Sequence, residues 1–316
     1  MRCLCCNKEI KNPTEYEIKV GWHVGCIRKF FGEDSIPQLD ISEKQLEELA
    51  STTVSKGLTV PGVQKKLSLH LDKEEKGSRF TIVDYPTGYI LKPQSEDYEA
   101  LPEAEFLSMK MAEIVGIKTV PNGLIYLDGK YAYITKRIDR HGDKLYAMED
   151  FCQLSGRLTA DKYKGSYEGC GRVINKYSKN VGVDKTEFFY RLLYCFVTGN
   201  SDMHLKNFSL IERAPASRVF GLSPAYDMLP VNVILPHDKD QMALSLNGKK
   251  RNIRKKDFIV LADNLGISEK TANKMILQLA KYRERMLEEI KISYMPDEMK
   301  KDMGRLFDVR MEGFLE

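Results

Sequence analysis

Residues 199–207 read GNSDMHLKN, a polar segment between two apolar ones. The residues before it, 185–198, repeat large apolar side chains at helical spacing, and residues 208–211 have the pattern of a buried β-strand. A polar loop held between a helix and a strand presents its side chains in a fixed geometry, as binding and catalytic loops do. This segment therefore predicts a functional site.

Asp202 and Asn207 are five residues apart within this segment. That spacing is the D-x-x-x-x-N of kinase catalytic loops, in which the Asp accepts the proton of the attacking hydroxyl and the Asn holds magnesium. The spacing alone is also common in surface turns. Asp227 adds a second carboxylate after a turn and is suited to share the magnesium ion, while His204 could either orient Asp202 or face solvent.

Lys92 ends a predicted strand over residues 89–92, where a kinase places the lysine that pairs with nucleotide phosphates. The helix predicted over residues 102–115 offers Glu103 and Glu105 as partners, and the sequence does not choose between them. The order of lysine, glutamate-bearing helix, Asp-x-x-x-x-Asn and Asp is the order along a kinase chain.

The apolar pattern changes along the chain. Short runs rich in β-branched and aromatic residues predict an antiparallel sheet over residues 67–135, and helical periodicity dominates beyond residue 148, with further helix over residues 267–292. A short amphipathic helix is expected over residues 42–50. We therefore expect a module at 1–35, a β-rich nucleotide-binding lobe at 50–147 and an α-helical catalytic lobe at 148–316.

The N-terminal module contains Cys3, Cys6, His23 and Cys26, in the pattern C-x2-C followed by H-x2-C. Each pair can turn back onto one ion, which predicts a zinc site, and four protein ligands leave no open position, which makes the zinc structural. The alternative is a set of buried reduced thiols. Cys5 could replace Cys3 or Cys6.

Bulk composition excludes several classes of protein. The net charge is +4 with 30% charged residues, a mild excess that does not by itself predict nucleic-acid binding. No stretch approaches the roughly 18 apolar residues of a membrane span, and no signal-peptide pattern follows Met1. A globular, cytoplasmic protein without membrane contact is expected.

Six motifs resemble the HipA-like toxin kinases in sequence and in order. They are residues 61–66 (PGVQKK), 90–93 (ILKP), 136–140 (KRIDR), 148–153 (MEDFCQ), 199–207 and 224–227 (PAYD). The resemblance covers about residues 50 to 310. It implies an α+β, two-lobed protein-kinase-like fold with a β-rich N-lobe and an α-helical C-lobe. It also implies that the protein transfers the γ-phosphate of ATP to a protein hydroxyl.

The resemblance also implies a role for each matching residue. Asp202 would be the base, Asn207 and Asp227 the Mg²⁺ ligands, and Lys92 the nucleotide lysine, with Thr135 and Lys136 near the adenine. The phosphate loop would include Gly62, Val63, Gln64, Lys65 and Lys66, although from the residues alone this stretch is a basic turn. Thr59 matches a regulatory autophosphorylation position, and the Ser pair often found there is absent because Gly57 occupies the other position.

The family's longer members begin with about a hundred β-rich residues, for which only about fifty exist here. The chain therefore resembles the short, HipT-like forms. The resemblance implies two partners, a separate small protein that resembles the missing N-subdomain and a HipB-like DNA-binding antitoxin, so that DNA contact is indirect. Its implied substrate is a translation component such as an aminoacyl-tRNA synthetase. Alternatives are a kinase-like co-repressor module without significant catalysis, or a small-molecule phosphotransferase.

Overall fold

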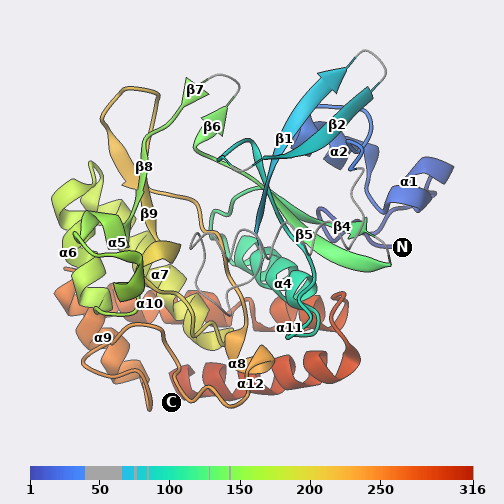
Figure 1. Ribbon diagram of the computed structural model, residues 1–316. Helices are drawn as coiled ribbons and strands as arrows, with labels where there is room; N and C mark the ends of the chain where they lie inside the picture. The colour runs from blue at the N-terminus through green and yellow to red at the C-terminus, as the bar shows by residue number, and fades with distance from the viewer. Residues whose placement is uncertain (40–65, 75–76, 84, 128, 142–143, 316) are drawn as a thin grey trace. The chain divides into compact units, whose positions relative to one another are not determined.

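The structure is a computed structural model that describes residues 1–39, 66–74, 77–83, 85–127, 129–141 and 144–315. Its helices and strands (Figure 1) are α1 Glu15–Val20, α2 Val24–Phe31, β1 Leu67–Glu74, β2 Gly77–Val83, β3 Tyr89–Lys92, α4 Leu101–Ile114, β4 Asn122–Leu127, β5 Lys130–Lys136, β6 Arg140–His141, β7 Lys144–Leu145, β8 Met148–Asp150, α5 Phe151–Leu154, η1 Thr159–Asp161, α6 Tyr167–Tyr177, α7 Val181–Val197, η2 Leu205–Asn207, β9 Ser209–Glu212, β10 Phe220–Leu222, α8 Val231–Ile234, α9 Lys255–Asn264, α10 Glu269–Ala280, α11 Arg283–Lys291 and α12 Asp297–Leu315.

The chain forms two compact units. Unit 1 comprises Met1–Phe106 and Val120–His141, and unit 2 comprises Leu107–Thr119 and Gly142–Glu316. The division falls inside α4, whose first six residues belong to unit 1.

Unit 1 is built on an antiparallel sheet with the strand order β2-β1-β3-β5-β4. Alternation along β2 puts Ser78 and Phe80 on the buried side, whereas β3 and β5 are buried along most of their length. A strand flanked by neighbours on both sides satisfies its backbone groups within the sheet, so it tolerates this burial. The antiparallel sheet predicted from the sequence is confirmed.

The N-terminal residues pack against this sheet within unit 1. Trp22 is fully buried and donates from Nε1 to the backbone oxygen of Leu124 at 2.8 Å. Gly123 makes the approach possible, because a Cβ there would lie 2.6 Å from the indole ring. The ring also contacts Phe30 and Phe31 of α2, with centroid distances of 5.3 and 5.5 Å. The N-terminal module thus shares an aromatic core with the sheet.

Unit 2 is mainly helical, with a small antiparallel sheet in the order β10-β9-β8. Helix α7 is central and packs against α6, α10, α12 and β10. Residues of α7 that lie on its buried faces include Phe188, which contacts Phe208 at a centroid distance of 5.0 Å, and Phe196, which contacts Phe258 at 5.4 Å. The helix predicted over 185–198 is therefore the core helix that precedes the polar segment.

One difference from the sequence expectations concerns a boundary. The helical region expected over residues 267–292 is two helices, α10 and α11, separated at Lys281 and Tyr282. The helix expected over residues 42–50 lies outside the described residues.

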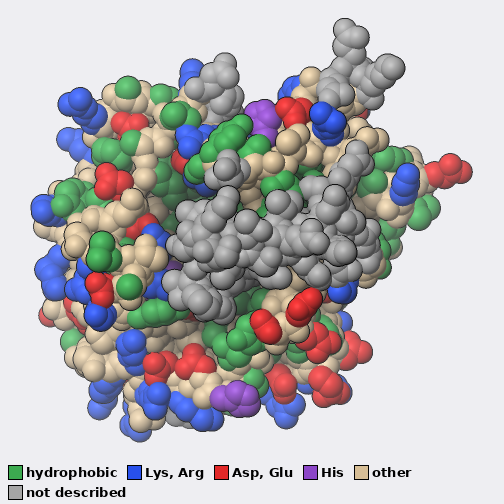
Figure 2. Space-filling model, viewed as in Figure 1, with side chains coloured by type: hydrophobic (Ala, Val, Ile, Leu, Met, Phe, Trp, Pro, Cys, Tyr) green, Lys and Arg blue, Asp and Glu red, His purple; other side chains and the backbone are tan. Residues whose placement is uncertain are grey.

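In the part of the chain that the structure describes, no helix combines the length and apolar content needed to cross a membrane. On the face shown in Figure 2, the coloured basic and acidic side chains are intermixed.

Candidate functional site

The Asp202 loop, defined as residues 199–207, connects the end of α7 to β9. Gly199 begins it with φ 73°, a left-handed conformation that suits glycine at a helix end. The Asn207 side-chain nitrogen donates to the backbone oxygen of Asp202 at 2.9 Å, and the His204 backbone nitrogen donates to the same oxygen at 2.8 Å. The structure therefore brings Asp202 and Asn207 together. Because the Asn207 nitrogen is engaged, its side-chain oxygen is the atom that could hold a cation.

Asp227 is connected to this loop through the neighbouring Tyr226. The Tyr226 hydroxyl donates to the backbone oxygen of Lys206 at 3.0 Å and shares a hydrogen bond with Ser209 Oγ at 2.5 Å. Asp227 itself has φ 58°, a left-handed conformation in which Asp is more common than most residues. The second predicted carboxylate is thus tied to the segment that contains Asn207, and the two side chains offer the oxygen ligands that magnesium prefers.

Tyr163 is part of the candidate site, although no sequence motif indicated it. Its hydroxyl donates to Asp202 Oδ1 at 2.5 Å, and its ring meets the His204 ring edge-on at a centroid distance of 4.9 Å. Burial and the adjacent Asp202 carboxylate raise the pKa of Tyr163, and Asp227 adds to the effect. Both predicted carboxylates, Asp202 and Asp227, therefore act on the same phenol by raising its pKa. Tyr163 lies 39 residues before Asp202 in a polar stretch, and no spacing or periodicity marks it.

His204 itself is buried, with 5% of its surface exposed. The alternative in which it faces solvent is therefore wrong. Its backbone nitrogen donates to the Asp202 backbone oxygen, and its ring contacts Tyr163, whose hydroxyl donates to the Asp202 carboxylate.

A polar network supports the Asp202 loop from the side of α12. Arg310 of α12 donates to the Phe196 backbone oxygen and to Asn232 Oδ1, both at 2.6 Å. The Asn232 backbone nitrogen donates to the Gly199 oxygen at 3.0 Å, and Ser201 Oγ donates to Asp238 at 2.7 Å. These partners come from segments 30 to more than 100 residues away, so sequence reasoning missed them.

Asp150 connects the motif at residues 148–153 to the same loop. Its carboxylate accepts from the backbone nitrogen of Gln153, and Gln153 Oε1 accepts from the Asp150 nitrogen, which together form a capping box on α5. The other Asp150 oxygen lies 2.7 Å from Lys206 Nζ. Asp150, at the start of α5, therefore helps to position the Asp202 loop through its ion pair with Lys206.

Lys92 forms a buried ion pair in unit 1. Its Nζ lies 2.6 Å from Glu105 Oε1, with side chains 4% and 1% exposed, and 5.3 Å from the centre of the Tyr133 ring. The structure thus chooses Glu105 over Glu103. Burial raises the pKa of Glu103 to about 7, and its Oε2 accepts no hydrogen bond from any described residue.

The residues expected near the adenine make contacts within unit 1. Thr135 Oγ1 donates to the Pro121 oxygen at 2.9 Å, and Lys136 Nζ donates to the Phe30 oxygen at 3.3 Å. Burial lowers the pKa of Lys136. Of the expected phosphate loop, Lys66 is described and half-buried, whereas Gly62, Val63, Gln64, Lys65 and the regulatory Thr59 lie outside the described residues.

The four predicted zinc ligands converge. The ligand atoms of Cys3, Cys6, His23 and Cys26 all lie within 4.8 Å of one another. Cys6 Sγ lies 3.5 Å from His23 Nδ1, and Cys26 Sγ lies 3.8 Å from it. Two ligands bound tetrahedrally at about 2.0–2.3 Å are roughly 3.5 Å apart, so these distances fit zinc. Hydrogen bonds from Cys3 and Cys5 lower the pKa of Cys26 to about 6, which favours the thiolate that binds metal.

Cys5, the suggested substitute ligand, is not one of the four clustered residues. Its Sγ is directed to the backbone oxygen of Asn122 at 3.9 Å. The donor set therefore comes from the C-x2-C and H-x2-C pairs predicted from the spacing.

The fold is similar to that of two solved structures. HipA from Shewanella oneidensis, solved in a complex of HipA, HipB and operator DNA, superposes with a TM-score of 0.70 at 19% identity, over 85% of this chain and 71% of that chain. The proinflammatory kinase CtkA from Helicobacter pylori superposes with a TM-score of 0.55 at 16% identity, over 79% of this chain and 93% of that chain. The kinase-like α+β fold predicted from the sequence is confirmed.

The chain belongs to the HipA-like C-terminal domain family, whose model matches residues 58–286. Y4dM of Sinorhizobium fredii, named as a candidate kinase, is 34% identical over 67% of this chain and 54% of its own length. A candidate kinase of Haemophilus influenzae is 27% identical over 76% of this chain and 77% of its own length. The serine/threonine-protein kinase toxin HipA of S. oneidensis is 23% identical over 66% of this chain and 52% of its own length. The match thus spans about half the length of Y4dM and of HipA.

Proposed function

We propose that this chain is an ATP- and Mg²⁺-dependent serine/threonine protein kinase that acts as the toxin of a HipA-type toxin–antitoxin system. The observation that carries the proposal is the Asp202 loop, in which Asn207 is bonded to the Asp202 backbone and the Asp227 segment is tied to Lys206. Membership of the HipA-like family supports it.

Each residue has a role in this proposal. Asp202 accepts the proton of the attacking hydroxyl, and the oxygens of Asn207 and Asp227 hold magnesium. Lys92, fixed by Glu105, pairs with nucleotide phosphates, and residues 62–66 form the phosphate loop. Thr135 and Lys136 border the adenine. When bound, ATP would supply the phosphoryl group, and the magnesium held by Asn207 and Asp227 would neutralise part of its negative charge. His204 orients Asp202 through the backbone hydrogen bond.

Replacing Asp202 tests the catalytic claim. We expect Asp202→Asn to lower phosphate transfer to protein by about 10²- to 10⁴-fold, because proton acceptance at the attacking hydroxyl is lost. Asp161→Asn, which changes a half-exposed carboxylate paired with Lys164, serves as the control and should keep its activity. Equal activity of wild type and Asp202→Asn would overturn the proposal.

Expression in growing bacteria with phosphoproteomics tests the biological role. Growth arrest together with one phosphorylated translation component, such as an aminoacyl-tRNA synthetase, is expected for wild type and not for Asp202→Asn. Phosphorylated metabolites alone would indicate a small-molecule phosphotransferase. Neither effect would indicate a co-repressor module.

The proposal includes partners and a location. The HipA structure that this fold matches was solved with HipB and operator DNA, which supports a HipB-like antitoxin through which DNA contact is indirect. A separate small protein that resembles an N-subdomain is the second proposed partner, and a cytoplasmic location remains a prediction. Thr59 is proposed as an autophosphorylation site. Mass spectrometry after incubation with ATP should find phosphate on the Thr59 peptide of wild type and none in Asp202→Asn.

We also propose that residues 1–35 form a structural zinc module, alongside the nucleotide-binding and catalytic regions at 50–147 and 148–316. Metal analysis of protein purified without chelator should find about one zinc per chain. Cys26→Ser should lose the zinc, whereas Cys5→Ser should retain it because Cys5 lies outside the four clustered ligands. Zinc-free wild type would contradict the assignment.

A further inference from the structure

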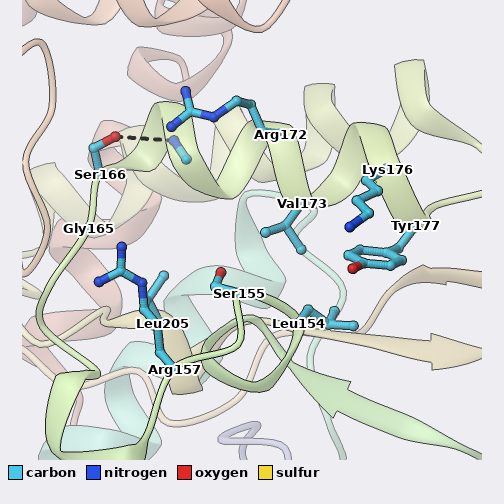
Figure 3. A pocket seen from close by; sticks show the side chains of 11 residues that line it. Leu154, Ser155, Arg157, Gly165, Ser166, Arg172, Val173, Lys176, Tyr177 and Leu205 are labelled. Carbon is cyan, nitrogen blue, oxygen red and sulfur yellow. Dashed lines mark hydrogen bonds between the residues drawn. The ribbon is translucent and has the colours of Figure 1, made fainter.

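Unit 2 contains a cavity of about 390 Å³ between α6 and the chain around α5 (Figure 3). Residues from three segments line it: Leu154, Ser155 and Arg157; Gly165, Ser166, Gly169, Arg172, Val173, Lys176 and Tyr177; and Leu205. Leu205 belongs to the Asp202 loop. The cavity therefore opens beside the proposed catalytic segment without containing any of its proposed catalytic residues.

The lining is strongly basic. It includes Arg157, Arg172 and Lys176 and no Asp or Glu. Two cations close to the cavity along the chain are paired, Lys164 with Asp161 and Lys206 with Asp150. Within the described ranges, by contrast, none of the three lining cations has a carboxylate within ion-pair distance.

The three cations approach the cavity from two walls. Arg172 and Lys176 are four residues apart on α6, so they share one face of the helix with Gly169 and Val173. Arg157 follows the turn at Gly156, and its guanidinium points toward α6 from the opposite wall (Figure 3). Like charges at this helical spacing repel one another. A bound anion would relieve that repulsion.

The rest of the lining suits a tetrahedral oxyanion. The Ser155 hydroxyl points into the space between the walls (Figure 3), and Tyr177 supplies a second hydroxyl. Leu154, Val173 and Leu205 form apolar parts of the lining, which lowers the local dielectric and strengthens charge–charge attraction. Arginine forks match phosphate oxygens in pairs.

We propose that this cavity binds the phosphoryl group of a phosphorylated side chain on a partner protein. A dianion with three acceptor oxygens suits a cavity lined by three cations better than a carboxylate does. Nucleic acid is recognised through cations spread along a track of phosphates, whereas these cations line one cavity of about 390 Å³. Binding itself does not depend on phosphoryl transfer by this chain.

The use of such a site rests on the proposed kinase function. Leu205 lies three residues after Asp202 in the same loop, so a protein held by its phosphorylated residue would present neighbouring residues beside that loop. The cavity would then select substrates that already carry a phosphate.

Peptide binding tests the proposal. The full chain with Asp202→Asn, without ATP, is titrated with two fluorescent peptide libraries that share random flanks and carry either one phosphoserine or one serine. We expect the phosphoserine library to bind at least about tenfold more tightly, and Arg172→Gln with Lys176→Gln to remove that preference.

Lys270→Gln with Lys274→Gln is the matched control. These cations have the same spacing on α10, and the same charge is removed, but neither lines the cavity. The control pair should keep the full preference. Equal binding of both libraries, equal loss in the two double variants, or tighter binding of a single-stranded RNA oligonucleotide that the same substitutions abolish would overturn the proposal. Since Asp202 is already replaced, loss of kinase activity cannot produce any of these results.

Discussion

The Lys92–Glu105 pair and the Asp202 loop fix functional side chains in opposite ways. The pair in unit 1 is two opposite charges almost removed from water, at 2.6 Å. The loop in unit 2 is held mainly by hydrogen bonds of its backbone groups, and the Asp202 side chain stays half-buried. A buried charge needs its partner, whereas a loop fixed through its backbone can lose one side chain and keep its shape. Stability should therefore respond to substitution in the first region, and activity in the second.

The largest effect is expected at Lys92. Lys92→Met should lower the free energy of unfolding by about 3–5 kcal/mol, because Glu105 would remain as a buried charge without its partner. Urea unfolding followed by the fluorescence of Trp22, the single tryptophan and a buried residue of unit 1, measures this directly.

The double variant Lys92→Met with Glu105→Leu should regain most of that stability, since replacing both charges by apolar groups removes the desolvation cost. Phosphate transfer should stay lost in both variants. Lys73→Met, which breaks an exposed pair with Glu33, serves as the control and should cost about 1 kcal/mol or less. If Lys92→Met costs no more than Lys73→Met, the contrast between the two regions fails.

A smaller, pH-dependent effect is expected at Glu103. Burial raises its pKa from 4.5 to about 7, so the folded chain favours the protonated carboxyl. The stability linked to this group is complete below about pH 4.5 and is lost as the pH rises through about 7, by about 3 kcal/mol.

Glu103→Gln should remove this dependence and stabilise unit 1 at pH 8, as measured by the same Trp22 signal over a pH series. Glu96→Gln, at an exposed carboxylate nearby, should leave the dependence in place. A flat wild-type profile between pH 5 and 8 would show that Glu103 is not held in an apolar environment.

The smallest change in stability is expected at Tyr163. Tyr163→Phe removes one hydrogen bond at a side chain that is 42% exposed, so it should cost about 1 kcal/mol or less. We expect kcat to fall about tenfold with KM for ATP unchanged, because Asp202 loses the donor that fixes its orientation.

Tyr126→Phe, at an exposed tyrosine of unit 1, is the control and should behave as wild type. A lower KM for the protein substrate with unchanged kcat would instead show that the phenol competes with the incoming hydroxyl for Asp202.

Local pattern was enough to predict much of the fold. The strands of the unit 1 sheet, the helix that became α4 and the core helix α7 follow from residue spacing, because periodicity reports which face of an element is buried. The pairing of Asp202 with Asn207 and the cluster of four candidate metal ligands were also predicted from spacing along the chain. Each arises from residues within one loop, or from two short pairs that turn back on themselves.

Other parts of the site had no local signal. Glu103 and Glu105 both lie in the first turns of α4, so spacing could not choose between them, and only the position of β3 next to that helix gave Lys92 its partner. Tyr163 and Arg310 reach the Asp202 region from 39 residues before Asp202 and from the C-terminal helix. The basic cavity likewise lies between two segments, residues 154–157 and α6, which only the fold places opposite one another.

The sequence by itself therefore determined which elements form, which loop is the candidate site and which family the chain resembles. Tertiary structure alone decided the surroundings of each charged group, which is why Glu105 is paired, the pKa of Glu103 is raised to about 7 and the cations of the cavity lack a carboxylate among the described residues. The physical reason is that periodicity depends on neighbours along the chain. The cost of burying a charge depends on groups that only folding brings within a few ångströms.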